Sequence, residues 1–215
     1  MDFPLHGKGR DMSVTLQELA IEAAGCTKCR LSQGRTQVVF GVGDPNAQVM
    51  FIGEGPGYYE DKQGEPFVGA AGQLLTRLLG EIGLRREDVY IANVVKCRPP
   101  GNRDPLPDEI EACRPYLQGQ LDLIRPRVVV TLGNFATRVI LDRQVSISRV
   151  RGQRFTVDGR TVIPTFHPAA VLHGGGEAGS QMAAIRQDFV TIKAVLAEPV
   201  PVAAAAAAQE QLDLF

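Results

Sequence analysis

The chain has 215 residues, a formal net charge of −1 at pH 7, 44% hydrophobic residues and 22% charged residues. These values are typical of one globular domain with a full core, and the near-zero charge gives no global sign of nucleic-acid binding. No run of 18 apolar residues occurs, which excludes a spanning helix, and the polar N-terminus Met1–Asp11 lacks the apolar segment of a signal peptide. We therefore expect a cytoplasmic protein that acts as a monomer.

The hydrophobic pattern predicts helices and strands that alternate along the chain. Thr15 and Glu18 have the spacing of a capping box for a helix over 16–24. Apolar runs and helical spacing then predict, in chain order, a strand at 48–52, a helix at 72–82, a strand at 90–95, a helix from 107 through 117, a strand at 127–132, a helix at 135–141, a hairpin of 155–157 with 161–163, and a last helix over 182–196. This alternation predicts a mainly parallel sheet that helices cover on both faces.

Composition divides the chain into three parts. Residues 1–198 contain all the expected helices and strands, and we expect them to form one domain. Residues 199–210 contain Pro199, Pro201 and a run of alanines, a composition that we expect to act as a tether. The last five residues, 211–215, follow this tether.

Four cysteines form two pairs, Cys26-x2-Cys29 and Cys97-x15-Cys113. Structural disulfides are rare in the cytoplasm, so we expect these thiols to have another role. Two thiolates separated by two residues can bind one metal centre from a single turn, and a loop with the start of a helix can supply the other two. A zinc ion and a 4Fe-4S cluster both fit this spacing, and unpaired core cysteines are the third alternative. The spacing predicts a metal site and leaves the metal open.

Polar groups follow several of the predicted strands at their carboxyl ends, where open α/β sheets bind ligands. The loop 53–57 is rich in glycine, which fits either a tight turn or a close approach to a ligand. Asn93 can read one edge of a base, and His167 can donate a hydrogen bond to a developing anion. Each of these residues, like Phe67 in the core, has a structural explanation when it is taken alone. Together they describe a pocket with a stacking ring, an edge reader and a charge stabiliser.

Three segments together resemble the family 4 uracil-DNA glycosylases, the thermostable, iron–sulfur type of bacteria and archaea. They are GEGPGYYEDKQGEPFVGAAGQLL at 53–75, NVVKCRPPGNRDP at 93–105 and HPAAVL at 167–172, and the cysteine spacing is similar as well. The resemblance spans residues 14–196. It implies a three-layer α/β/α sandwich with a mainly parallel central sheet, one 4Fe-4S cluster on the four cysteines, and a monofunctional glycosylase that removes uracil from DNA.

The resemblance also implies which groups would surround the uracil. They are the backbone of Glu54, Gly55 and Pro56 against the ring, Phe67 stacked on it, Asn93 at its edge and His167 at O2. Glu54 and Glu60 are the two acidic candidates for polarising water or stabilising the cationic sugar, and the sequence does not rank them. Glycosylases flip the target base out of the duplex, and donors aimed at the leaving base stabilise its negative charge.

Two further features are candidates for contact with DNA. In HPAAVL, Leu172 or Val171 could fill the space that the flipped base leaves, although a position in the core fits equally well. The segment 143–157 carries four arginines and no acidic residue, and both a DNA-binding patch and a solvated surface fit this charge. Basic residues near the cysteines favour a DNA-positioning role for the cluster. They are Lys28, Arg30, Lys96, Arg98 and Arg103.

The chain ends in Gln211-Leu212-Asp213-Leu214-Phe215. This sequence resembles the pentapeptide with which bacterial repair and replication proteins bind the sliding clamp. A tether that ends in leucine and phenylalanine anchors suits capture by a hydrophobic groove. The resemblance therefore implies two partners, uracil-containing DNA and the clamp.

Two other classes of function remain open at this point. A noncatalytic DNA-binding or recruitment module could use the same pocket and the same C-terminal peptide. An iron–sulfur electron carrier would explain the cysteines, but it would leave Asn93 and His167 without a purpose. Excision of uracil from DNA distinguishes these alternatives from the glycosylase.

Overall fold

A six-stranded sheet forms the centre of the protein, whose computed structural model describes residues 14–199. The strands lie in the order β1-β3-β2-β4-β6-β5. Their bounds are Val42–Gly43 (β1), Val49–Gly53 (β2), Tyr90–Asn93 (β3), Val128–Leu132 (β4), Phe155–Val157 (β5) and Arg160–Thr165 (β6). Strands β2, β3, β4 and β6 are parallel, whereas β1 and β5 pair antiparallel with their neighbours at the two edges. The expected mainly parallel sheet is confirmed.

Helices connect the strands, as the alternating pattern predicts. Their bounds are Leu16–Ala24 (α1), Tyr58–Gln63 (α2), Ala70–Glu81 (α3), Pro107–Ile124 (α4), Gly133–Leu141 (α5), Ile147–Val150 (α6), Pro168–His173 (α7) and Ser180–Ala197 (α8), with short 3-10 turns at Arg30–Gln33, Arg86–Asp88, Pro100–Asn102 and Gly176–Ala178. The Thr15 hydroxyl accepts from the Glu18 amide at 3.2 Å, and the Glu18 carboxylate accepts from the Thr15 amide at 2.7 Å, which is the expected capping box. The sequence did not predict α2 and α6, because helices of six and four residues are too short to show a period.

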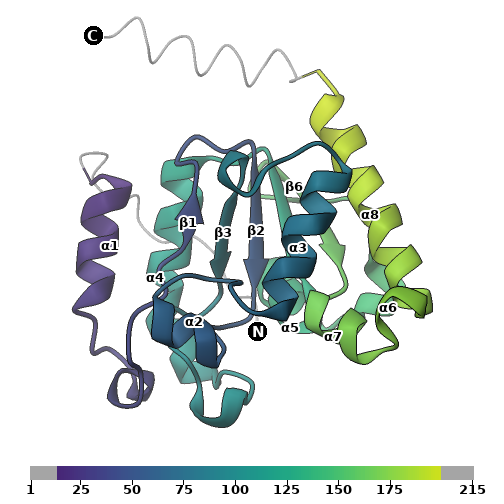
Figure 1. The fold of residues 1–215 in the computed structure, drawn as a ribbon. Helices are drawn as coiled ribbons and strands as arrows, with labels where there is room; N and C mark the ends of the chain where they lie inside the picture. Colours follow the sequence, from purple (N-terminus) through teal and green to yellow (C-terminus); the bar gives the residue numbers. More distant parts are fainter. Residues whose placement is uncertain (1–13, 200–215) are drawn as a thin grey trace, which may run out of the picture.

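The sheet separates two hydrophobic cores, so the molecule has three layers (Figure 1). Met50 and Ile52 of β2 pack with α1, α4 and α5 in one core. Val49 and Phe51 alternate with them and pack with α3, α7 and α8 in the other core. This arrangement is the expected α/β/α sandwich.

The carboxyl ends of the parallel strands meet at one edge of the sheet, where α2 and α7 also lie (Figure 1). The loop 53–57 follows β2, Asn93 ends β3 and His167 follows β6. Because parallel strands bring these segments to one edge, the fold places residues that are far apart in sequence around a common space. Among residues 14–199, no helix is both long enough and apolar enough to cross a membrane.

Candidate active site and cysteine centre

A cavity of about 420 Å³ opens at the carboxyl edge of the sheet. All of the residues that the sequence places around the base line it: Glu54, Gly55, Pro56, Glu60, Phe67, Asn93 and His167. The lining also includes residues that sequence reasoning did not single out, such as Ala71, near the start of α3, and Asn102, from the 3-10 turn after β3. These residues lie close together because the segments that carry them end at the same edge of the sheet. A short sequence motif cannot indicate such proximity, because it covers only neighbouring residues.

Asn93 lies in the wall of this cavity with 2% of its surface exposed. Its Oδ1 atom is buried and has no hydrogen-bond partner among the described residues. Gly53 lies directly opposite Asn93 in the parallel pairing of β2 with β3, and a Cβ atom at Gly53 would be 2.4 Å from that Oδ1. Glycine at 53 therefore leaves room for the amide. A buried acceptor without a partner is uncommon in proteins, and at the wall of a cavity it indicates a ligand that donates.

His167 is the N-cap of α7, and its Nδ1 atom accepts a hydrogen bond from the Ala169 amide at 3.2 Å. Burial lowers the pKa of His167 to about 4, against a smaller opposing effect of Glu60, so the imidazole is neutral at pH 7. In a neutral imidazole whose Nδ1 accepts, the proton lies on Nε2. His167 can therefore donate one hydrogen bond from Nε2 to a group in the cavity.

The Phe67 ring stacks against the His167 ring, with centroids 5.6 Å apart and planes at 30°. Phe67 has φ of 54°, a left-handed conformation that is rare for a bulky residue and that clusters at functional sites. The turn at Phe67 packs directly against Gly72. A Cβ atom at position 72 would lie 1.7 Å from the Phe67 carbonyl oxygen, so the turn requires glycine there. The sequence motif thus encodes a strained turn that presents an aromatic ring to the cavity.

The two acidic candidates have different surroundings. The Glu60 carboxylate accepts hydrogen bonds from the amides of Val68 and Gly69, at 3.1 and 3.2 Å, and so it holds the turn that carries Phe67. The Glu54 side chain has no hydrogen bond or ion pair within the part of the chain that the structure describes. Burial, together with the negative charge of Asp104, raises the pKa of Glu54 to about 7. Of the two, Glu54 has the free carboxylate.

All four cysteines line a second, small cavity between the end of α1, the loop after β3 and α4. None of them forms a disulfide. The Lys96 amide donates to the Cys113 sulfur at 3.2 Å, and the Arg35 guanidinium donates to the Cys97 sulfur at 3.6 Å. Such N–H donors stabilise thiolates in iron–sulfur and other metal sites. Burial raises the pKa of the Cys97 thiol to about 11, against the opposing effect of the Arg35 guanidinium, so a thiolate here needs further positive charge beside it.

The arrangement of these thiols bears on the kind of centre that fits. Among residues 14–199, no three His, Cys, Asp or Glu side chains are grouped as ligands of a single metal ion. The four thiols converge on one cavity, and thiolates are ligands of both zinc and iron–sulfur centres, so this geometry fits a thiolate-bound centre of either kind.

The position of Lys96 contradicts its expected role among the basic residues that would position DNA near the cysteines. Its side chain is 1% exposed, and its Nζ atom donates to the Asn93 carbonyl oxygen at 2.8 Å and to the Gln120 side chain at 2.6 Å. It cannot contact DNA, because it lies inside the protein. Three others form ion pairs with carboxylates, at 2.6 to 2.9 Å. These pairs are Lys28–Glu22, Arg30–Asp108 and Arg103–Glu109.

Burial and ion pairing reduce the number of residues that could contact DNA in two other segments, the wedge candidates of α7 and the arginine-rich segment 143–157. Val171 is fully buried in the core, which excludes it as a wedge, whereas Leu172 is only partly buried beside the same core. Arg151 and Arg154, from the arginine-rich segment, form ion pairs with Asp188 and Glu198. Two of the four arginines in that segment therefore have a carboxylate partner within the protein.

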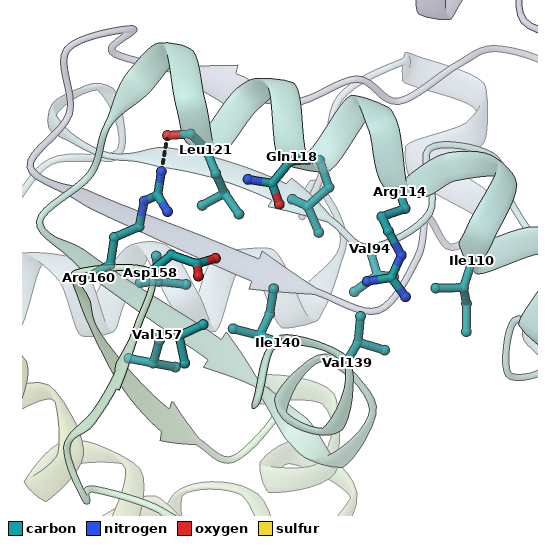
Figure 2. A pocket seen from close by; sticks show the side chains of 13 residues that line it. Val94, Ile110, Arg114, Gln118, Leu121, Val139, Ile140, Val157, Asp158 and Arg160 are labelled. Carbon is teal, nitrogen blue, oxygen red and sulfur yellow. Dashed lines mark hydrogen bonds between the residues drawn. The ribbon is translucent and has the colours of Figure 1, made fainter. Parts of the chain in front are cut away.

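A third cavity lies between α4, α5 and the β5–β6 hairpin (Figure 2). Its walls are mainly aliphatic, as Figure 2 shows for Ile110, Val139, Ile140 and Val157. The Arg160 guanidinium at its rim donates to the Leu121 carbonyl oxygen at 3.1 Å. Its volume of about 40 Å³ is too small for a base, and none of the residues proposed for chemistry lies in it.

Comparison with known proteins agrees with this geometry. Residues 40–190 match the model of the Uracil DNA glycosylase superfamily. The chain is 52% identical over 167 residues to the type-4 uracil-DNA glycosylase of Archaeoglobus fulgidus. This alignment covers 74% of this chain and 84% of the Archaeoglobus protein. The chain is also 54% identical over 149 residues to the type-4 uracil-DNA glycosylase of Thermotoga maritima. That alignment covers 68% of this chain and 78% of the Thermotoga protein. The chain therefore belongs to the uracil DNA glycosylase superfamily and, within it, to the type-4 family.

Proposed function

We propose that this protein excises uracil from DNA by hydrolysing the N-glycosidic bond, which leaves an abasic site for base-excision repair. The observation that carries the proposal is the buried, unpartnered Oδ1 atom of Asn93 in the wall of the large cavity. Family membership supports the same reaction. A base in a duplex is out of reach of this cavity, so the enzyme would flip the target nucleotide, at a cost of a few kcal/mol.

Asn93 would select uracil through one edge of the base. Its Oδ1 would accept the N3–H of uracil, and its amide nitrogen would donate to O4. Cytosine carries an acceptor at N3 and an amino group at C4, so both of its edge groups would meet groups of the same kind in Asn93. A site built to hydrogen-bond one pattern rejects the reversed pattern strongly, because the buried groups are left unpaired.

His167 and Glu54 would act on opposite charges of the transition state. As the glycosidic bond breaks, negative charge grows on the uracil and positive charge grows on the sugar. The Nε2–H of neutral His167 would donate to O2 of the leaving base, which stabilises the anion without moving a proton. The free Glu54 carboxylate would stabilise the cationic sugar or orient the attacking water. Glu60 would act indirectly, since it holds the turn that presents Phe67 for stacking.

Cys26, Cys29, Cys97 and Cys113 would hold one 4Fe-4S cluster. The support is their convergence on one cavity, the N–H donors to two of the sulfurs and the similarity of the chain to type-4 uracil-DNA glycosylases, the family whose cysteine spacing it resembles. When bound, the cluster supplies a structural cross-link between α1, the loop after β3 and α4, and no step of the excision passes through it. The cluster would thus fix the backbone next to Asn93.

Excision assays with site variants test the proposal. The enzyme is incubated with uracil-containing oligonucleotides, and alkali then cleaves the abasic sites. We expect Asn93→Ala to lower kcat/KM about a hundredfold, because two hydrogen bonds to the base are lost. His167→Ala should lower kcat by a similar factor, as for other donors to a developing anion. Val190→Ala, at an exposed position on α8, is the control. No excision by the wild-type protein in any sequence context would refute the proposed reaction.

Leu172 would act as a wedge in the duplex. It lies beside the core without lining the cavity, on the α7 helix that follows His167. Leu172→Ala should slow excision from double-stranded DNA about tenfold and leave single-stranded substrates unaffected, because only the duplex must be opened. Equal slowing of both substrates would point to a packing role.

The C-terminal residues Gln211, Leu212, Asp213, Leu214 and Phe215 would bind the bacterial sliding clamp, with 199–210 as the linker. Both segments lie outside the described residues apart from Pro199, so the proposal rests on the sequence. Deletion of 211–215 should abolish binding to the clamp in a pull-down with purified proteins. Excision from short oligonucleotides should stay unchanged. Full clamp affinity in the truncated protein would refute this role.

A further inference from the structure

Two adjacent aromatic side chains stand exposed at the rim of the large cavity. Tyr58 and Tyr59, the first residues of α2, are 51% and 61% exposed, and their rings meet edge to face with centroids 5.4 Å apart. The residue before them, Gly57, lines the cavity, and so does Glu60 in the next position of the helix. Exposed tyrosine pairs are unusual on a protein surface, because aromatic rings favour burial or a binding partner.

Cationic side chains flank this pair. The Arg98 guanidinium lies 5.2 Å from the Tyr58 ring centroid, and the Lys62 ammonium lies 5.9 Å from it. The Arg98 Nε atom donates to the Asn102 side chain at 2.7 Å, and Asn102 lines the cavity. Neither cation forms an ion pair with a carboxylate of residues 14–199, unlike Arg30 and Arg103 nearby. The rim therefore offers uncompensated positive charge beside exposed rings.

We propose that Tyr58, Tyr59, Arg98 and Lys62 form a subsite for an unpaired nucleotide that flanks the flipped uracil in the same strand. The base of that nucleotide would stack on a tyrosine ring, and its phosphate would lie against the two cations. Rings that stack bases beside basic groups are the general device of single-strand binding, and stacking accepts every base because each has a π face. The subsite rests on the proposed function for its substrate, and it would hold the strand next to the reacting nucleotide.

The tyrosines also provide the signal that tests the subsite. The chain contains no tryptophan and four tyrosines, of which Tyr90 and Tyr116 are buried. Tyrosine emission that single-stranded DNA quenches would therefore come from Tyr58 and Tyr59. We expect an eight-nucleotide oligo-dT, which contains no uracil, to quench the full-length protein, and we expect Tyr58→Phe to lose part of the quenching but to keep most of the affinity.

Affinity for a fluorescein-labelled oligo-dT of the same length, followed by anisotropy, gives the second measurement. Replacement of both tyrosines, Y58A/Y59A, should weaken binding about tenfold, as for the loss of a stacked base, and should raise KM for single-stranded uracil DNA with little change in kcat. Arg98→Gln and Lys62→Gln should each reduce the dependence of affinity on salt. Val190→Ala, another exposed apolar side chain, should bind like the wild type.

The outcomes separate the subsite from the proposed reaction. Unchanged affinity in a folded Y58A/Y59A protein would overturn the subsite, whether or not uracil is excised. Weaker binding in the charge variants alone would also overturn it, because charge would then act without stacking. Tyrosine-dependent binding of oligo-dT by a protein that excises no uracil would support the subsite and refute the reaction.

Discussion

The Nζ atom of Lys96 lies 2.8 Å from the backbone carbonyl oxygen of Asn93. The amide of the same lysine donates to the Cys113 sulfur at 3.2 Å. One buried residue therefore contacts both the cysteine centre and the strand end that carries the base-reading amide. The base-binding cavity and the cysteine centre, which the sequence presents as separate motifs, are therefore connected through Lys96.

Replacement of Lys96 by methionine should destabilise the protein. The variant keeps the volume of the side chain but removes two hydrogen bonds, to the Asn93 carbonyl oxygen and to Gln120, and leaves both acceptors buried. We expect a loss of about 2 kcal/mol in the free energy of unfolding, or about 6 °C in Tm. Differential scanning calorimetry measures this change. Lys193→Met, at an exposed position of α8, is the matched control and should change Tm by less than about 2 °C. Equal Tm values for the two variants would contradict the structural role.

Replacement of a cysteine by serine should affect the fold as well as the metal content. Cys113 belongs to α4, and its sulfur accepts from the Lys96 amide, so loss of a metal centre there would loosen the backbone beside Asn93. Cys113→Ser should lose iron and the visible absorbance of thiolate-bound iron, and its Tm should fall on the order of 10 °C. Iron analysis and thermal denaturation of the purified protein provide the measurements. A variant with full iron content would rule out Cys113 as a ligand, and zinc in the wild type would refute the cluster.

The pH dependence of excision should follow the titration of the Glu54 carboxyl group. Burial and the charge of Asp104 raise the pKa of Glu54 from its ordinary value of 4.5 to about 7, so the reactive carboxylate forms only as the pH rises through neutrality. We expect kcat to increase between pH 6 and pH 8 and to level off above. His167, with a pKa near 4, should contribute no change in this window. Because the folded state holds this proton more tightly than the unfolded state, the Glu54 contribution to stability is present below pH 4.5 and is lost as the pH rises from 4.5 to about 7.

Two variants identify the group responsible. Glu54→Gln should remove the acid limb of the profile and lower kcat throughout. Asp104→Asn removes the neighbouring negative charge, so the limb should move to lower pH while kcat at pH 8 stays near the wild-type value. An unmoved limb in Asp104→Asn, or a limb retained in Glu54→Gln, would assign the titration to another group.

Addition of one methyl group at Gly53 should block the site. A Cβ there would lie 2.4 Å from the Asn93 Oδ1 atom and 2.7 Å from the Phe67 ring, closer than real Cβ contacts allow. Gly53→Ala should reduce kcat/KM by about two orders of magnitude, because displacement of Asn93 costs the hydrogen bonds to the base. Gly80→Ala is the matched control, since that Cβ would meet nothing within 4 Å on the helix α3. It should leave excision unchanged and stabilise the helix by up to about 1 kcal/mol.

Local chemistry explains which parts of the fold could be read from the sequence. The capping box of Thr15 and Glu18 gave the bounds of α1, and the apolar runs gave the buried strands, since both signals are confined to a few neighbouring residues. The helix α2 was missed because it is short and polar, and with it the exposed Tyr58–Tyr59 pair. The roles suggested for Lys96 and Val171 were wrong, because burial depends on contacts with distant segments.

By itself, the sequence determined the family, the parallel sheet and the residues gathered at its carboxyl edge, because the motifs and the alternation of helix and strand are local patterns. Only the tertiary structure decided how those residues differ in charge and pairing. Burial keeps His167 neutral, and nearby backbone amides occupy Glu60 while Glu54 stays free. The pairing of β2 with β3 leaves the Asn93 oxygen without a partner. These properties come from desolvation and from distances between segments that are far apart in the chain.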